Sequence, residues 1–153
     1  MRYFFTCCLI FAATIAVSAQ EKVPTIFQLS DVEKLNAQLQ EQYPQDFFTA
    51  VDNDFGRAEG IYLEVMKSVD AFARSINYDI DGMKVWIQFF IGTDGSIQHL
   101  GFQLRPESRN MDVSEIKAFF KAYIEKNRFP LTADQPFNYY TRATFPTIAR
   151  RAD

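Results

Sequence analysis

The chain contains few residues suited to thiol or metal chemistry. It has two cysteines, Cys7 and Cys8, and a single histidine, His99. Both cysteines lie within residues 1–19, which have the features of a secretory signal peptide, so the mature chain is expected to lack cysteine. That excludes disulfides and thiol catalysis from it, and a zinc site would need several His, Cys or carboxylate ligands. His99 lies in a predicted strand, with no nucleophile motif in the chain, and we interpret it as an ordinary strand residue.

An excess of basic residues is also missing. The chain has 16 Lys and Arg against 19 Asp and Glu, a net charge of -3, whereas nucleic-acid binding usually requires a basic face. The N-terminal apolar run, residues 9–17, is shorter than the ~20 residues that a membrane span needs. With Arg2 before it and Val17-Ser18-Ala19 at its end, it predicts a cleaved signal peptide and a mature N-terminus at Gln20. An uncleaved membrane anchor is the alternative.

Apolar residues are plentiful, at 48% of the chain with 16 Phe, which is ample for a core. Residues 84–91 and 96–104 are apolar runs of strand length on either side of the turn Gly92-Thr93-Asp94-Gly95. An Asp-Gly pair between two such runs predicts a β-hairpin. A helical period over residues 112–127 and a last β-like run over residues 139–148 follow. This order predicts an α+β fold, a small antiparallel β-β-α-β sheet with one packed helix.

Residues 20–81 are predicted to form an N-terminal helical segment with two helices. A capping-box pattern at residues 30–33 starts the first helix, which should end near Gln42, and a longer helical period follows it. The first strand of the sheet has large apolar groups on both faces. The face with Trp86 and Phe90 needs a second cover, which the N-terminal helices can supply, so Trp86 is expected to be buried.

Several motifs occur in a fixed order within residues 82–149. Gly82 precedes the first strand, the hairpin turn reads Asp94-Gly95-Ser96-Ile97, and a helix follows a short polar connection. Arg128-Phe129-Pro130 comes after that helix, and the last strand contains Thr144-Phe145-Pro146-Thr147-Ile148. In this order and spacing, the segment resembles the C-terminal domain of TonB-type energy transducers. It departs from the family pattern ahead of Gly82, where there is no clear membrane anchor followed by a proline-rich spacer.

The resemblance implies a protein-binding function. In the family, this domain contacts the periplasmic side of outer-membrane transporters and adds a strand to their short recognition segment. We therefore expect an exported, non-enzymatic adaptor that binds another envelope protein by strand addition. The resemblance implies a periplasmic location in a Gram-negative bacterium, and secretion is the other possibility. Without an anchor and spacer, such a protein would not transmit force from an inner-membrane motor.

The last strand is the expected partner site. Pro146 lacks an N–H, and proline in sheets is confined largely to edges, strand starts and bulges, so we expect this strand at a sheet edge. An edge strand offers unpaired backbone groups to an incoming strand. The expected partner-binding residues are Tyr139, Tyr140, Thr141, Arg142, Ala143, Thr144 and Phe145, and residues 150–153 are expected to form a tail.

A second function remains open at this point. It is a small-ligand carrier, with an apolar pocket between the N-terminal helices and the face that bears Trp86 and Phe90. Asp52-Asn53-Asp54 is similar to the start of a calcium loop, but Leu63 stands where such a loop has its bidentate Glu, so we interpret the run as a turn. We expect no catalytic residue, no cofactor, no metal and no nucleic-acid partner.

Overall fold

The computed structural model describes residues 22–147, with the side chains of residues 32–34 excepted. The predicted signal peptide (residues 1–19), the expected mature N-terminus at Gln20 and the predicted tail (residues 150–153) lie outside the described residues. Among the helices that are described, none is both long and apolar enough to cross a membrane.

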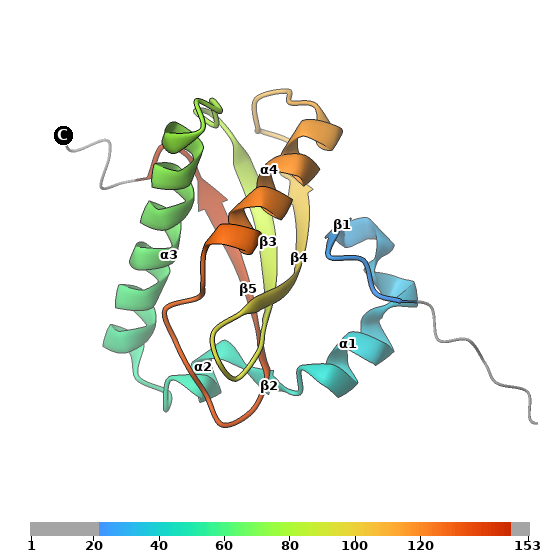
Figure 1. Cartoon of the computed structure of the whole chain (residues 1–153), viewed down its shortest axis with the longest axis vertical. Helices are drawn as coiled ribbons and strands as arrows, with labels where there is room; N and C mark the ends of the chain where they lie inside the picture. The colour runs from blue at the N-terminus through green and yellow to red at the C-terminus, as the bar shows by residue number, and fades with distance from the viewer. Residues whose placement is uncertain (1–21, 148–153) are drawn as a thin grey trace, which may run out of the picture.

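Five strands form one sheet in the order β1-β4-β3-β5-β2 (Figure 1). β3 (Lys84–Ile91) and β4 (Ile97–Leu104) form the predicted antiparallel hairpin, and β5 (Phe137–Thr144) pairs antiparallel with β3 along its full length. Two short strands flank them in parallel, β1 (Ile26–Gln28) beside β4 and β2 (Gln45–Asp46) beside β5. The predicted α+β class is therefore confirmed, and the sheet is mostly antiparallel.

The hairpin turn between β3 and β4 is fixed by local chemistry. Gly95 has φ +80°, and a Cβ at this position would lie 2.7 Å from the Phe129 carbonyl oxygen. Glycine is therefore required both for the positive φ and for the lack of space. The Asp94 carboxylate accepts a hydrogen bond from the Ser96 N–H at 3.0 Å and from the Arg128 guanidinium at 3.0 Å. The hydrogen bonds from Ser96, followed by Arg128, hold the pKa of Asp94 well below its usual range.

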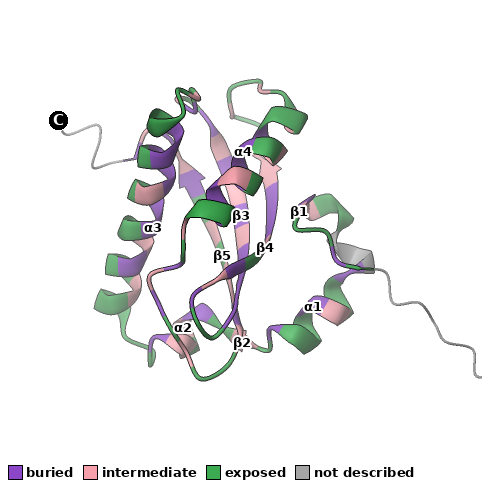
Figure 2. Ribbon diagram, viewed as in Figure 1, coloured by how far each residue is buried: buried purple, intermediate pink, exposed green. Residues whose placement is uncertain are grey.

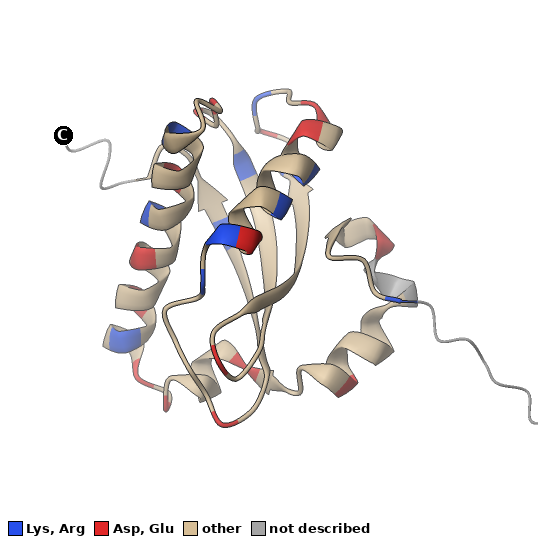
Figure 3. Ribbon diagram, viewed as in Figure 1, with Lys and Arg blue, Asp and Glu red and all other residues tan. Residues whose placement is uncertain are grey.

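Two long helices, α3 (Phe55–Ser75) and α4 (Val113–Lys126), cover one face of the sheet, here called the inner face (Figure 1). α4 begins at the start of the predicted helical period, where the Asp112 carboxylate accepts hydrogen bonds from the N–H groups of Ser114 and Glu115. Both helices turn buried residues toward the sheet and exposed residues toward solvent (Figure 2). Acidic and basic residues are mixed along their exposed sides (Figure 3).

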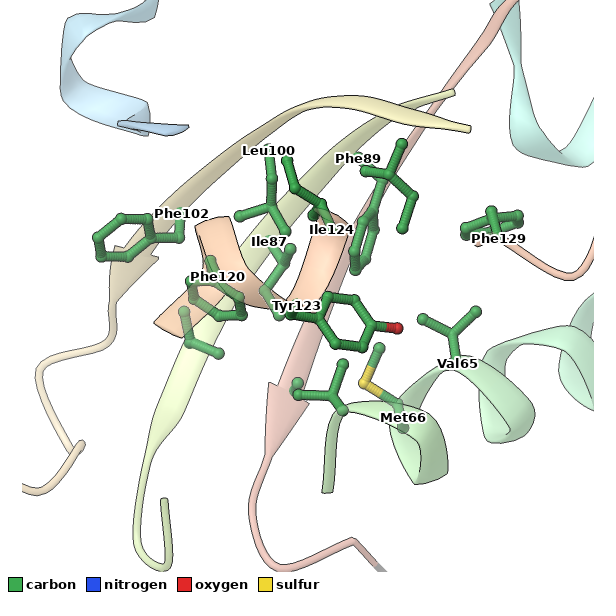
Figure 4. Close-up of a cluster of buried hydrophobic side chains, with 14 of the residues drawn as sticks. Val65, Met66, Ile87, Phe89, Leu100, Phe102, Phe120, Tyr123, Ile124 and Phe129 are labelled. Carbon is green, nitrogen blue, oxygen red and sulfur yellow. The ribbon is translucent and has the colours of Figure 1, made fainter. Parts of the chain in front are cut away.

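The main core lies between these helices and the three long strands. α4, the predicted packed helix, contributes an apolar stripe, and α3 contributes its own stripe to the same core. The hydroxyls of Tyr123 and Ser68 form a hydrogen bond of 2.6 Å between the two helices, and burial raises the pKa of Tyr123. Figure 4 shows how side chains from both helices, the sheet and the loop after α4 converge: Val65, Met66, Ile87, Phe89, Leu100, Phe102, Phe120, Tyr123, Ile124 and Phe129.

Residues 22–46, here called the N-terminal arm, cross the opposite, outer face of the sheet. The arm runs from β1 at the β4 edge, through η1 (Leu29–Lys34) and α1 (Asn36–Gln42), to β2 at the β5 edge. Its apolar residues form a second buried cluster with Phe90 of β3; they are Val23, Phe27, Leu35, Leu39 and Tyr43. The short helix α2 (Phe47–Ala50) then leads toward α3.

The N-terminal segment differs from its prediction in several respects. Its long helix α3 packs on the inner face beside α4, and not on the face with Trp86 and Phe90 as expected. The first expected helix is divided, since only α1 is α-helical and η1 is a 3-10 helix. The capping pattern at residues 30–33 does not cap α1, whose N-cap is Leu35, and the Ser30 hydroxyl donates to Asp31 instead at 3.3 Å. β1 and β2 were not predicted, because strands of three and two residues are too short to show a period.

Candidate partner-binding edge

β5 is open along most of one side. β3 pairs with all of Phe137–Thr144, whereas β2 pairs only with Phe137 and Asn138. β2 ends there because Asp46 caps the next helix, its carboxylate accepting hydrogen bonds from the Thr49 N–H (2.9 Å) and hydroxyl (2.7 Å). These bonds lower the pKa of Asp46. Among the described residues, no strand lies beyond residues 139–144, here called the open edge.

The last strand was expected at the edge of the sheet, and residues 139–144 do lie at an open edge. The reason given, the proline at position 146, was wrong. Pro146 lies after the end of β5 and so does not mark the strand as an edge. The chain leaves the sheet at Phe145, whose N–H donates to the Met83 carbonyl at 2.9 Å. The buried Asp70 carboxylate of α3 then accepts the Thr147 N–H (3.0 Å) and hydroxyl (2.9 Å). The early end of β2, and not proline, leaves the edge open.

The backbone groups along the open edge alternate in direction. The Phe145 N–H donates to the carbonyl of Met83, the residue just before β3. In an antiparallel pair every second residue bonds to the same neighbouring strand, so alternate residues back along β5 also bond to β3. These residues are Ala143, Thr141 and Tyr139. The N–H and C=O groups of the residues between them therefore point away from the sheet; these residues are Tyr140, Arg142 and Thr144.

The side chains of the expected partner site are distributed over two faces. Tyr140, 56% exposed, and the exposed Arg142 project from the outer face, together with the half-buried Thr144. Tyr139 and Thr141 are half-buried on the inner face, where the Tyr139 ring lies 4.1 Å from that of Phe47. The remaining two expected residues, Ala143 and Phe145, are buried in the core. The structure thus leaves five of the seven accessible at the edge and assigns two to packing.

Helix α3 provides a wall beside this edge that sequence analysis did not identify. The Tyr62 hydroxyl lies 3.4 Å from the Arg142 carbonyl oxygen, an outward-facing acceptor. Phe55, seven residues earlier and so on the same side of the helix, is 80% exposed and packs its ring on Phe48 at 4.6 Å. The seven-residue spacing of Phe55 and Tyr62 was visible in the sequence, but the strand beside them was not.

Trp86 lies on the outer face next to the open edge. In the register of β3 it stands between Arg142 on β5 and Gln103 on β4. It is half-buried, and the Arg105 guanidinium carbon lies 6.0 Å from its ring centre. The expectation that Trp86 is buried was therefore wrong. The cover that the N-terminal arm provides is centred on Phe90, four residues along the strand.

His99 has a structural environment. Its Nδ1 lies 2.9 Å from the Pro24 carbonyl oxygen of the arm, and its ring meets that of Tyr43 edge-on at 6.0 Å. Burial lowers the pKa of His99, against the opposing effect of the Pro24 hydrogen bond. In the described part of the chain, no group of three or more His, Cys, Asp or Glu is arranged to hold a metal. Asp52, from the run compared with a calcium loop, pairs with Arg57 at 3.0 Å.

The space considered for an apolar ligand is filled where the arm covers the sheet. The Phe90 ring lies 5.2 Å from that of Tyr43 and 6.1 Å from that of Phe27, and all three side chains are buried. A surface hollow of about 380 Å³ exists elsewhere, where the end of α3 meets α4 near Ile76 and Phe119. Around Phe90, the described side chains of the arm therefore occupy the space in which the carrier alternative placed its ligand.

Comparisons with known proteins do not assign this arrangement to a family. The chain was compared with protein-family models, curated proteins and solved structures, and none of the three comparisons gave a match.

Proposed function

We propose that this protein is an exported, non-enzymatic adaptor that binds another envelope protein by accepting one of its extended segments at the open edge of β5. The observation that carries the proposal is the row of outward backbone groups on Tyr140, Arg142 and Thr144, beyond which no described strand lies. Such docking takes its affinity from main-chain hydrogen bonds and its selectivity from alternate side chains.

The resemblance to TonB C-terminal domains supports the same proposal. The hairpin, the helix α4 and the last strand occur in the order that suggested the family, and the last strand has an open edge over residues 139–144. Each intramolecular or intermolecular hydrogen bond contributes a net ~0.5–1.5 kcal/mol. Three outward residues therefore favour a reversible contact over a permanent complex.

The decisive substitution is Arg142→Pro. It deletes an outward N–H and leaves the hydrogen bonds to β3 in place, and proline is tolerated at such positions of edge strands. Arg142→Ala is the matched control, because it removes the same side chain and keeps the N–H. Proline at Thr141 or Ala143 would instead break the ladder to β3 and test only the fold.

The measurement is chemical cross-linking in envelope extracts followed by mass spectrometry, with circular dichroism as the check on folding. Wild type and Arg142→Ala should capture the same partner, and Arg142→Pro should lose it. Capture of that partner by a folded Arg142→Pro variant would overturn strand addition at β5.

Export is tested separately. The proposal places the mature N-terminus at Gln20, and mass spectrometry of protein recovered from the periplasm or medium should find it there or within a residue or two. Recovery of the intact chain in the membrane fraction would establish an anchor and favour the energy-transducer function.

A further inference from the structure

A strand added to β5 would turn its side chains alternately to two different environments. Successive residues of a strand point to opposite faces of the sheet. Partner residues on the outer face would stand beside Tyr140, Arg142 and Thr144, and those on the inner face would stand beside Tyr139 and Thr141. The chemistry of the two faces therefore specifies the pattern of the incoming segment.

The outer face beside the open edge is basic. Arg142 is exposed, and among the described residues it has no ion-pair partner. Lys84 of β3 stands opposite Thr144 of β5. Arg105 comes directly after the end of β4, and its N–H donates to the Lys84 carbonyl oxygen at 2.9 Å. Glu107 lies 3.6 Å from the Arg105 guanidinium. Directly opposed side chains of neighbouring strands lie ~5 Å apart at Cβ, so a partner carboxylate opposite Arg142 would be within reach of it.

The inner side of the open edge is apolar and aromatic. It is bordered by Tyr62, whose hydroxyl lies 3.4 Å from the Arg142 carbonyl. The exposed ring of Phe55 lies two turns earlier on the same side of α3. The exposed Glu59 lies between them on the same side of α3. An acidic partner side chain would meet a like charge there, whereas an aliphatic one would cover the two rings.

We infer that the accepted segment alternates acidic and aliphatic side chains, with the acidic ones on the outer face beside Arg142 and the aliphatic ones against Phe55 and Tyr62 of α3. This inference rests on the proposed strand addition. It names the partner by its chemistry, an extended acidic–aliphatic segment, and it assigns selectivity to residues on β5 and α3.

The test uses capped decapeptides that alternate Glu and Val, Gln and Val, Lys and Val, or Glu and Ser. Trp86 is the only tryptophan and lies next to Arg142, so its fluorescence reports binding at this edge. At low salt the Glu/Val peptide should bind about fivefold tighter than Gln/Val, which in turn should bind tighter than Lys/Val, in keeping with exposed ion pairs. The Glu/Ser peptide should bind at least about tenfold more weakly than Glu/Val, because it leaves the rings of α3 uncovered.

Arg142→Gln locates the charge preference. It should reduce the difference between the Glu/Val and Gln/Val peptides to less than about twofold, since the exposed pair is lost. Lys121→Gln is the control with the same change of charge, because Lys121 is exposed on α4, which covers the inner face. An undiminished preference in Arg142→Gln would overturn the assignment of selectivity to this residue.

Amide hydrogen exchange separates this inference from the proposed function. Strand addition should protect the N–H groups of Tyr140, Arg142 and Thr144 when the Glu/Val peptide binds. Protection with equal affinity for the Glu/Val, Gln/Val and Lys/Val peptides would overturn the acidic pattern and leave strand addition in place. Binding without protection of these three amides would overturn both. Failure of the Glu/Val peptide to bind would overturn the inference, and the cross-linking of Arg142→Pro would still decide the function.

Discussion

The two halves of the outer face differ although their central residues are alike. Phe90 and Trp86 are large aromatic residues on the same strand and the same face, four positions apart. Phe90 is 2% exposed under the N-terminal arm, whereas Trp86 is half-buried and lies beside the open edge. The inner face shows no such division, because α3 and α4, together with α2 and the loop after α4, supply buried residues along it (Figure 2).

The neighbours of the two aromatic residues explain the difference. Beside the covered half, Gly101 has no side chain, and the Phe27 ring and the Leu29 methyl occupy the space where its Cβ would stand, each 2.7 Å away. Beside the open half, Trp86 has Gln103 and Arg142 as its neighbours in the sheet. If the arm lay over Gln103 and Arg142, it would bury polar groups that water otherwise solvates, which is unfavourable. The arm therefore packs over Gly101 instead. A large aromatic residue on a strand is therefore not by itself a sign of core.

The fully covered inner face should be the most sensitive to truncation. Phe119 of α4 is buried against Phe72, Tyr78 and Phe120. Phe119→Ala should lower the free energy of unfolding by about 3–5 kcal/mol, a large share of the ~5–15 kcal/mol of a typical domain. Urea unfolding followed by Trp86 fluorescence measures it. An unchanged midpoint would show that α4 turns a different face to the sheet.

Gly101→Ala should make the covered half resemble the open half. The added Cβ would displace Phe27 and Leu29, and overpacking of this kind costs about 1–3 kcal/mol. The loss should be local, with faster amide exchange in β1 and unchanged exchange in α4. Gly60→Ala is the matched control, because no atom lies within 4 Å of a Cβ there and helix propensity favours alanine. Equal amide exchange in β1 of the Gly101→Ala and Gly60→Ala variants would mean that Gly101 does not determine where the arm packs.

Acidification should loosen the same contact. Burial lowers the pKa of His99, so the folded arm binds a proton less readily than the unfolded chain, whose histidine titrates near 6.5. The stability that neutral His99 contributes is complete above that pH and is lost as the pH falls toward the folded-state pKa. The protection factors of the β1 amides, which correct for the slower intrinsic exchange at lower pH, should therefore fall between pH 7.5 and pH 5. His99→Gln should abolish this dependence, and a dependence that persists in it must come from other groups.

The sequence could predict the parts of the fold that depend on local pattern. The Asp94-Gly95 hairpin, the α4 stripe and its Asp112 cap, and the α+β class all follow from spacing and turn chemistry. The short strands β1 and β2 could not be predicted, because their pairing is decided by β4 and β5, which are distant in sequence. The capping pattern at residues 30–33 was misleading for the same reason.

The candidate edge was predictable only in part. The last strand was predicted at residues 139–148 and at the edge of the sheet, whereas β5 is Phe137–Thr144 and β2 lies beyond its first two residues. Its openness depends on where β2 stops, and that is set by the Asp46 cap of α2. The contribution of Tyr62 and Phe55 depends on α3 lying beside β5, a tertiary arrangement that no periodicity encodes. Partner binding itself stays a prediction.

Trp86 gives the smallest expected effect and the sharpest contrast with Phe119. Its side chain is half-buried, and the Arg105 guanidinium carbon lies 6.0 Å from its ring centre, an interaction of about 0.5–1 kcal/mol at exposed sites. Trp86→Ala should therefore lower the free energy of unfolding by about 1–2 kcal/mol, less than Phe119→Ala, since the half-buried ring already leaves part of its apolar area in water. Circular dichroism must follow the urea unfolding, because the variant lacks the only tryptophan. A loss as large as that of Phe119→Ala would mean that Trp86 is covered in solution, and the open half of the outer face would then not be available to a partner.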